Sequence, residues 1–436
     1  MTGDVLKATH SPMQRTGAAG LLVRSAVWIG LAAILALLPL VFKTGTSLTV
    51  MSLMGIAIIF ALSYNILLGQ TGMLSFGHAV YYGLGAYLVV HSINVVTANK
   101  LPIPLPLMPL VGGLAGLFFG LLFGWVSTKR SGTAFAMISL GLAELVGSSA
   151  LILRGFFGGE EGITTNRAKL LRVFDWSFGP QIQVYYLIAA WCLLCIFLMY
   201  KITRTPLGRM CNAVRDNAER VQFVGYNPQV VRFLAFCLSG FFAGIAGGLA
   251  AINFEIANFA LFSAAQSGTV LLATFIGGAG YFFGPIIGAV LVSYLQVMLS
   301  DLTEIWQLYF GLMFIAVVMF APAGIAGLIM MHQPLLKRGT LLKVLPSYVL
   351  ALIPALVMSA GLVLIIEMAF RISSKDGEEA MIKVFGLHQP ATSPMLWGVA
   401  LAMFVMGLIA FRMTWPAISA AWTRATAADE RGGRTA

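Results

Sequence analysis

Twelve apolar stretches follow one another along this chain, most of them about 20 residues long, the length that a helix needs to cross a bilayer. Within lipid every backbone N–H and C=O must be bonded inside the protein, so such stretches predict helices. Only 10% of the residues are charged, against about 25% in an average soluble domain. We therefore predict an all-α polytopic membrane protein. The expected spans lie near 25–42, 47–68, 78–97, 106–127, 133–153, 183–200, 231–253, 266–280, 285–300, 307–330, 345–367 and 395–413.

The placement of basic residues predicts which side of the membrane each loop faces. If the chain starts in the cytoplasm, most of the 27 Lys and Arg residues fall on the cytoplasmic side, and most acidic residues fall on the other. This distribution follows the positive-inside rule, so we expect both termini in the cytoplasm. The net charge of +11 then reflects membrane topology and predicts no nucleic-acid partner.

The spans and polar segments together predict five consecutive parts. The apolar run at 25–42 is long for a secretory signal and no clear cleavage site follows it, so we interpret it as a retained signal-anchor helix. The predicted parts are a cytoplasmic tail at 1–24, a transmembrane core at 25–330, a cytoplasmic linker at 331–344, a two-helix transmembrane extension at 345–413 and a cytoplasmic tail at 414–436.

Glycine recurs every four residues in three places. Such stripes let helix backbones approach closely where lipid provides no hydrophobic drive for packing. We interpret them as packing positions within the chain, with a subunit interface as the alternative. The residues are Gly112, Gly116, Gly120, Gly124, Gly240, Gly244, Gly248, Gly280, Gly284 and Gly288.

Two segments, 65–78 and 266–280, are interrupted by glycine and polar residues at membrane depth. Backbone groups freed at such breaks must face protein or water, and discontinuous helices often line a transport path. Glu144 is the most deeply placed acid, which indicates either a transport role or a structural hydrogen bond. His78 could meet substrate or simply pack. The candidate residues of the translocation path are Asn65, Gln70, Thr71, Ser75, His78, Glu144, Gln266 and Ser267.

Residues 201–228 form the longest polar segment between spans. Thr205 can cap a helix start, Pro206 fits the first helical position and Gly225 suits a helix end. Apolar residues at helical spacing predict one apolar side, and charged residues occupy the other. The apolar side holds Met210, Val214, Val221 and Val224, and the charged side holds Arg209, Arg215, Asp216, Glu219 and Arg220. We predict a short cytoplasmic helix over 206–224 that binds a soluble partner.

The sequence contains no recognisable catalytic chemistry. It lacks a G-x-x-x-x-G-K-[ST] nucleotide loop, a nucleophile elbow and His residues at metal-ligand spacing. We therefore expect no catalytic residue, no metal and no cofactor in this chain, and we do not expect an enzyme. An ion-coupled secondary transporter usually carries more charge inside its spans, so the energy source is expected on another subunit.

Several separated motifs resemble those of one transporter family. They are YNILLGQTGMLSFGHAVYYGLGAY at 64–87, GTAFAMISLGLAEL at 132–145, GGEEG at 158–162, TPLGRMCNAVRDNAERVQFVGYNP at 205–228, FIGGAGYFFGPIIGA at 275–289 and LYFGLMFIAVVMFAPAGIAGL at 308–328. Over roughly residues 20–330 the chain resembles the LivM-type permeases of branched-chain amino-acid ABC transporters. The two spans after residue 330 depart from the usual length of that family.

The resemblance implies a type II permease core of about ten helices in the bacterial inner membrane, here with two extra C-terminal transmembrane helices. It also implies a LivH-like second permease, two cytoplasmic ATPases that hold ATP and magnesium, a periplasmic amino-acid-binding protein and surrounding membrane lipid. The implied function is import of branched-chain or related hydrophobic amino acids. The alternatives are a permease for urea, amides or another amino-acid-like solute, or an ion-coupled secondary transporter.

The resemblance further implies that the helix after Thr205 is the coupling helix that docks into a groove on the ATPase. We expect its apolar side to supply most of the contact, and Arg209 and Arg215 to meet acidic residues of the ATPase. The predicted coupling residues are Thr205, Pro206, Gly208, Arg209, Ala213, Val214, Arg215, Asp216, Asn217, Val221 and Gly225.

Overall fold

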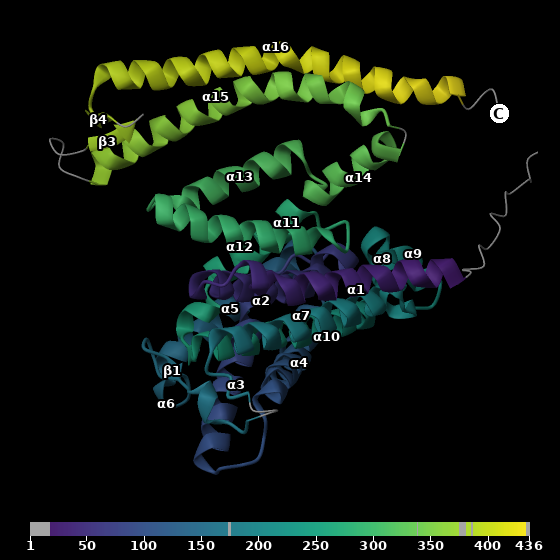
Figure 1. Cartoon of the computed structure of the whole chain (residues 1–436). Helices are drawn as coiled ribbons and strands as arrows, with labels where there is room; N and C mark the ends of the chain where they lie inside the picture. Colours follow the sequence, from purple (N-terminus) through teal and green to yellow (C-terminus); the bar gives the residue numbers. More distant parts are fainter. Residues whose placement is uncertain (1–17, 173–175, 338, 375–380, 385–386, 433–436) are drawn as a thin grey trace, which may run out of the picture. The chain divides into compact units, whose positions relative to one another are not determined.

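The computed structural model describes residues 18–436 except 173–175, 338, 375–380, 385–386 and 433–436. Most of the expected N-terminal tail and part of the loop before the last span therefore lie outside the described residues. The chain divides into two compact units (Figure 1). The first unit comprises Met1–Leu302 with Gly311–Ala326, and the second comprises Thr303–Phe310 with Gly327–Ala436.

The first unit is a bundle of apolar helices with short connections. Its helices are α1 (Ala18–Val41), α2 (Gly45–Thr71), α3 (Ala79–Ala98), α4 (Met108–Ser127), α5 (Thr133–Ile152), α6 (Arg154–Phe157), α7 (Gln181–Arg204), α8 (Pro206–Asp216), α9 (Ala218–Phe223), α10 (Pro228–Phe254), α11 (Ala264–Gly277) and α12 (Gly284–Leu302). Short 3-10 turns lie at Leu105–Leu107, Arg167–Lys169 and Phe259–Phe262. Strands β1 (Ile163–Thr164) and β2 (Ile256–Ala257) pair antiparallel, with Ile163 opposite Ala257.

Helix α13 (Trp306–Phe320) has residues in both units, and α14 (Gly324–Lys337) follows it after a short break. The second unit also contains the long helices α15 (Leu341–Ser374) and α16 (Pro394–Gly432). Between them, β3 (Met381–Val384) and β4 (Leu387–Pro390) form an antiparallel hairpin.

Among the described residues, nine helices are long and apolar enough to cross a membrane, or ten if α13 and α14 form one broken span. A helix occupies each of the twelve expected ranges, but three of those ranges differ from a full-length continuous span. In α1 the apolar stretch found among the described residues is only Ala26–Val41. Helix α11 has 14 residues and is about 21 Å long, too short for a hydrocarbon core of about 30 Å. The expected span at 307–330 is bent by 41° between α13 and α14.

Glycine explains the bend at Gly324. Its φ is 66°, in the left-handed region that other residues rarely adopt. A Cβ at this position would also lie 2.5 Å from the backbone of Gly278, so the two segments meet backbone to backbone. The chain therefore cannot continue as one straight helix here, and the span expected at 307–330 is a bent pair of helices.

Helices α4 and α10 cross along the glycine stripes. A Cβ at Gly116 would collide with the carbonyl oxygen of Gly240, and a Cβ at Gly244 would collide with that of Gly112. The backbones can approach this closely only because the side chains are absent. Gly280 differs from these positions, because it is exposed and has no neighbouring atom within 4 Å of a built Cβ.

Helix α1 contains Pro39, which has no N–H to bond the carbonyl of Leu35 one turn earlier. The hydroxyl of Tyr185 on α7 donates to that carbonyl at 2.7 Å. The proline thus leaves a free acceptor on α1, and α7 supplies its donor.

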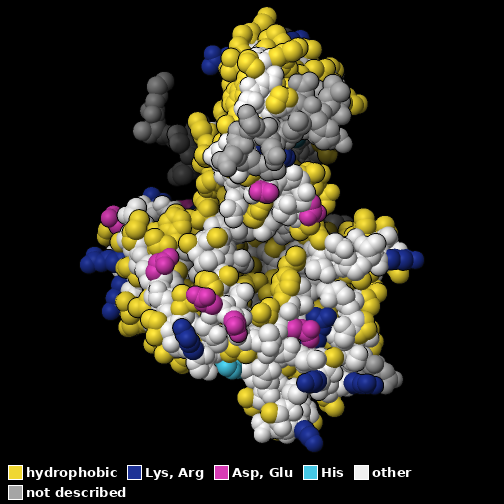
Figure 2. Space-filling model, turned by 90° about the vertical axis from the view of Figure 1, so that its left-hand side faces the viewer, with side chains coloured by type: hydrophobic (Ala, Val, Ile, Leu, Met, Phe, Trp, Pro, Cys, Tyr) yellow, Lys and Arg dark blue, Asp and Glu magenta, His cyan; other side chains and the backbone are white. Residues whose placement is uncertain are grey.

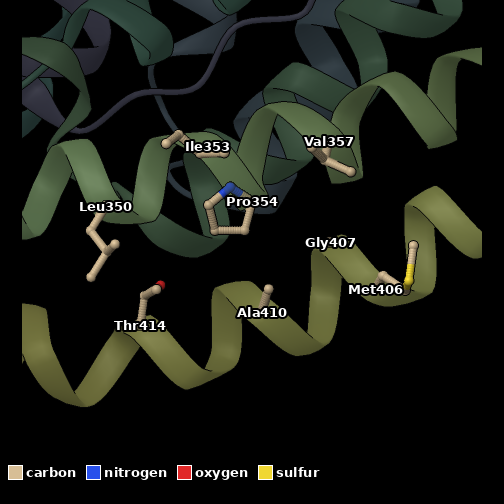
Figure 3. Close-up of a pocket in the computed structure, with 8 residues that line it drawn as sticks. All are labelled: Leu350, Ile353, Pro354, Val357, Met406, Gly407, Ala410 and Thr414. Carbon is tan, nitrogen blue, oxygen red and sulfur yellow. The ribbon is translucent and has the colours of Figure 1, made fainter.

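In the second unit, α15 and α16 lie side by side as a helical hairpin (Figure 1). Their backbones approach closely at Gly407, where a built Cβ would lie 2.5 Å from the backbone nitrogen of Met358. Next to this contact a groove of about 380 Å³ separates the helices at Pro354 (Figure 3). It is lined by Leu350, Ile353, Pro354, Val357, Met406, Gly407, Ala410 and Thr414.

Large hydrophobic side chains cover much of the surface of each unit (Figure 2). Phe118 on α4 is 61% exposed and Met413 on α16 is 76% exposed. Outward-facing apolar side chains are expected on helices that contact lipid. The chain is therefore a multi-pass membrane protein.

Candidate functional site

The chain between α2 and α3 turns back into the membrane without forming helix. Helix α2 ends at Thr71, and Gly72 closes it in the left-handed region with a φ of 70°. Residues 72–78 then run back beside α2, and the ring of His78 hydrogen-bonds Ser63 at 3.0 Å. Ser63 lies eight residues, about 12 Å, before the end of α2. Helix α3 therefore starts about two helical turns back along α2 from its end.

Side chains from three helices satisfy the backbone of this segment. The N–H of Phe76 donates to Ser139 Oγ on α5 at 3.0 Å, and the N–H of Ala79 donates to Ser267 Oγ on α11 at 3.1 Å. The carbonyl of Ser75 accepts from Tyr64 on α2 at 3.0 Å. Non-helical backbone at membrane depth persists only when such partners are present. Segment 72–78 is therefore held in place by α2, α5 and α11.

Buried polar atoms without partners gather around this segment. His78 is fully buried between aromatic rings, stacked on Phe60 at 5.4 Å and edge-on to Tyr64 at 5.2 Å. Four buried atoms here have no hydrogen-bond partner among the described residues: Asn65 Oδ1, Gln70 Oε1, Ser75 Oγ and His78 Nδ1. Such an atom costs about 1–3 kcal/mol when it stays unpaired. This concentration is typical of a functional site rather than of simple packing.

The structure thus brings together most of the residues predicted for the translocation path. Asn65, Gln70, Ser75 and His78 belong to α2 or to segment 72–78, and Ser267 bonds its end. The hydroxyl of Thr71 instead donates to Leu67 in its own helix, so it bonds no other element. Gln266 lies in the first turn of α11, where its N–H donates to Ser263 Oγ.

Glu144 lies apart from that cluster, on the other side of α5. The buried side of α5 contacts segment 72–78 through Ser139 and Ala143. Glu144 is exposed and has no hydrogen bond or ion pair with any described residue. Met137, Gly141 and Ser148 recur with it at helical spacing, so they form one exposed face of α5. A carboxylate in a span costs about 2.5–3.5 kcal/mol at the membrane centre when it faces lipid. This face therefore needs water or another protein beside it.

The polar segment 201–228 folds into two helices, so the prediction of a single helix over 206–224 is wrong. Thr205 Oγ1 accepts from the N–H of Gly208 at 3.4 Å and caps α8. Asn217 interrupts the helix with an extended backbone, and its side chain accepts from the N–H of Arg220 at 2.9 Å, which caps α9. Asn217 favours a cap over a helix interior because its side chain competes for backbone N–H groups.

Most of the predicted apolar side of α8 and α9 faces the chain's own bundle, with the exception of Val224. Val214 is 2% exposed and Val221 is 5% exposed, so neither can contact a partner, and the expectation that they bind the ATPase is wrong. A short helix at the membrane surface needs this burial to be stable. The buried thiol of Cys211 lies on the same side, and burial raises its pKa to about 11.

Three other hydrophobic residues are exposed after α9 begins. Phe223 is 90% exposed, Val224 is 70% exposed and Tyr226 is 52% exposed. A groove of about 500 Å³ lies next to Tyr226, between α8 and the start of α10. We call Phe223, Val224 and Tyr226 the exposed apolar patch. Sequence periodicity missed Phe223 and Tyr226 because they do not share the helical spacing of the buried valines.

The two arginines expected to contact the ATPase differ in direction. Arg209 is exposed and lines the groove beside α8. Arg215 is also exposed, with 38% of its side chain accessible, but its Nη1 donates to the carbonyl of Gly69 near the end of α2 and its Nε pairs with Asp216 at 3.2 Å. Gly208 marks the corner between α7 and α8, because a Cβ there would lie 2.6 Å from the carbonyl oxygen of Ile202.

At the other end of the bundle, Arg167 closes the end of α10. Its guanidinium donates to the carbonyls of Ile252 at 3.0 Å, Asn253 at 2.9 Å and Phe178 at 2.9 Å. Burial lowers the pKa of this group, and the neighbouring Glu255 partly opposes that shift. A lone arginine in a polar connection belongs to no motif, so this role could not be predicted from the sequence.

Residues 46–322 match the model of the family described as branched-chain amino acid transport system / permease component. This match covers well over half of the chain. The chain belongs to this permease family. The resemblance to LivM-type permeases drawn from the sequence motifs is therefore confirmed.

Three relatives illustrate the range of the permease family. The branched-chain amino acid permease LivM of Escherichia coli K12 is 27% identical over 323 residues, which cover 69% of this chain and 73% of LivM. The probable branched-chain amino acid permease LivH of Methanocaldococcus jannaschii is 25% identical over a match that covers 56% of this chain and 82% of that LivH. The ribose import permease RbsC of Haemophilus influenzae is 24% identical over a match that covers 52% of this chain and 72% of RbsC. No solved structure matches the chain significantly.

Proposed function

We propose that this permease imports branched-chain or related hydrophobic amino acids across the bacterial inner membrane as one subunit of an ABC transporter. The observation that carries the proposal is segment 72–78, a non-helical stretch with unpaired polar atoms inside a bundle of the branched-chain amino acid permease family. Because relatives named LivM and LivH both match, the second permease is proposed to be LivH-like. The remaining partners are two ATPases, which hold ATP and magnesium, and a periplasmic amino-acid-binding protein.

The exposed face of α5 is the proposed wall of the translocation path. It carries Glu144 and the small residues Gly141 and Ser148, and it cannot face lipid without a large cost. A second permease opposite this face would enclose a water-filled path between the two subunits. The carboxylate of Glu144 would then be a favourable partner for the ammonium group of a passing amino acid.

Segment 72–78 is the proposed moving part of the wall. It hydrogen-bonds α5 through Ser139 Oγ, and the next residue, Ala79, bonds Ser267 Oγ on α11, so it can shift without unfolding a helix. Binding of ATP closes the two ATPases, and that closure moves α8 and α9. The transporter then shifts between inward and outward states because the ATPases bind the two states differently.

The exposed apolar patch is the proposed docking surface for an ATPase, together with Arg209. Both termini and α8–α9 are proposed to be cytoplasmic, in agreement with the positive-inside rule. Exposed ion pairs contribute only about 0–1 kcal/mol each, so Phe223, Val224 and Tyr226 supply most of the binding energy.

The first experiment tests docking with purified complexes. Phe223→Ser should reduce the ATPase that co-purifies with the permease about tenfold, because a 90% exposed aromatic ring is lost from the patch. Phe254→Ser is the matched control, since Phe254 is half exposed at the opposite end of α10. Full ATPase recovery with Phe223→Ser would remove the patch from the proposal.

The second experiment tests the transport reaction. Proteoliposomes with both permeases, the ATPases and the binding protein should take up leucine in a vanadate-sensitive manner. Uptake by the permease chain alone, without ATPases, would instead establish a secondary transporter.

A second candidate function is import of a different small solute, because one relative is a ribose import permease. Competition for the binding protein separates the two. Displacement of labelled leucine by isoleucine and valine, but not by urea, acetamide or ribose, is the expected result.

A further inference from the structure

The carbonyl of Gly69 lacks a backbone partner at the end of α2. In a continuing helix it would accept from the N–H of Met73. That N–H instead donates to Leu67, and the N–H of Gly72 donates to Leu68, because Gly72 turns the chain out of the helix. The free carbonyl of Gly69 receives Nη1 of Arg215 from α8.

The stem of Arg215 also covers Gly72. A Cβ built on Gly72 would lie 3.1 Å from Cγ of Arg215, so the methylene groups pack directly over the glycine backbone. Asp216 accepts from Nε of the same guanidinium at 3.2 Å and fixes its direction. One side chain of α8 thus contacts both a carbonyl in the last turn of α2 and the first residue of segment 72–78.

From Gly72 the contacts continue to both neighbours of segment 72–78. Phe76 bonds Ser139 on α5, the helix whose other face carries Glu144. Ala79 bonds Ser267 on α11. A contiguous set of contacts therefore leads from α8 through Arg215 and segment 72–78 to the two helices beside it.

We infer that Arg215 is a positioning residue that makes segment 72–78 follow the movement of α8. This inference rests on the proposed function, and it assigns the partly exposed side chain of Arg215 to a contact within the permease rather than to ATPase docking. An arginine suits this role because its planar guanidinium can donate to Gly69 and Asp216 at the same time, whereas a lysine offers a single charged nitrogen.

The direct test of the contact needs no transport. Hydrogen exchange of the peptide covering residues 68–79 is measured in the detergent-purified complex. Arg215→Ala should accelerate exchange at least fivefold there, and Arg130→Ala should not. Arg130 is a matched control because it is exposed in the turn after α4, whose last turn packs on the start of α10.

The functional test compares ATP hydrolysis with leucine uptake in proteoliposomes. Arg215→Ala should keep co-purified ATPase and hydrolysis within twofold of wild type, while leucine uptake per ATP falls at least tenfold. Arg215→Lys should recover part of that ratio, and Asp216→Asn should lower it two- to threefold. If Arg215→Ala does not fold, the uptake per ATP of Arg215→Lys and Asp216→Asn tests the inference instead.

Two results would overturn the inference. The first is an unchanged uptake per ATP in Arg215→Ala, and the second is loss of the ATPase from that variant, which would make Arg215 a docking residue. A wild-type complex without ATP-dependent uptake would instead refute the proposed function, while the exchange experiment would still report on the Arg215 contact.

Discussion

Helices α3 and α15 show opposite relations between polarity and burial. The most apolar part of α3 is 72% buried within the protein, whereas that of α15 is only 17% buried. Yet α15 is the more apolar helix of the two, and α3 contains glycines, tyrosines and polar residues. In a membrane, strong hydrophobicity marks the surface that meets lipid, and small or polar residues mark the surface that meets protein. Helix α3 in the first unit therefore buries its glycines and tyrosines, whereas the α15–α16 hairpin makes close backbone contact at Gly407 and leaves most of its apolar surface exposed.

The largest expected effect is the loss of helix packing when a glycine at the α4–α10 contact is replaced. Gly116→Leu places a side chain against the carbonyl of Gly240, so α4 and α10 cannot pack, and we expect the monodisperse protein to be lost in size-exclusion chromatography. Gly398→Leu on α16 should give near wild-type yield, since nothing lies within 4 Å of that position. Equal yields would mean that backbone contact does not distinguish the two regions.

A second comparison concerns polar residues within spans. Glu144→Gln should lower leucine uptake at least tenfold with little change in Tm, because it removes a charge from an exposed face without disturbing packing. Thr414→Ala should leave uptake unchanged, since that hydroxyl only donates to Phe411 of its own helix. Retained uptake in Glu144→Gln would remove the carboxylate from the proposed path.

A third comparison concerns the contribution of serine hydroxyls to stability in the two regions. Ser267→Ala leaves the buried N–H of Ala79 without its acceptor, so we expect a loss of about 1–3 kcal/mol, measured as a lower Tm of the purified protein. Ser359→Ala on α15 should change Tm by less than a degree, because its hydroxyl bonds only Ala355 one turn earlier. A similar shift in both variants would contradict the assignment of Ser267 as a link between elements.

The smallest effect concerns Cys211. Its pKa is raised from 9.0 to about 11, so at pH 8 the reactive thiolate falls from about 9% to about 0.1% of the thiol. A maleimide should therefore leave Cys211 unmodified at pH 8, as read by mass spectrometry, and reactivity should increase only as the pH approaches 11. Val224→Cys in the exposed apolar patch should react within minutes. Rapid labelling of Cys211 would show that α8 does not stay packed on the bundle.

The sequence predicted the location of every membrane helix because apolar length alone determines where a chain can span lipid. It also predicted a break within 65–78, although α2 continues to Thr71 and only residues 72–78 are non-helical. The other expected break, at 266–280, is helical up to Gly277 in α11. It failed at Asn217, because one capping side chain divides α8 from α9. It failed again at Val214, since periodicity identifies an apolar face and cannot say whether that face meets the chain itself or a partner.

The sequence could not predict the roles of Ser139, Tyr64 and Arg167. Each acts through a backbone group that is distant in the chain: Ser139 through Phe76, Tyr64 through Ser75, and Arg167 through the end of α10. Nothing in the neighbouring residues indicates such a partner. Only the arrangement of helices in space brings donor and acceptor together.

The network at Arg167 determines how α10 can move. The guanidinium holds the carbonyls of Ile252 and Asn253, so the last turn of α10 is fixed to the connection before α7. The first turn of α10 follows directly after α9 and the exposed apolar patch. A helix fixed at one end and displaced at the other cannot slide along its axis. We expect α10 to pivot about Arg167, so that a small displacement near Tyr226 decreases steadily along the helix and vanishes at Asn253.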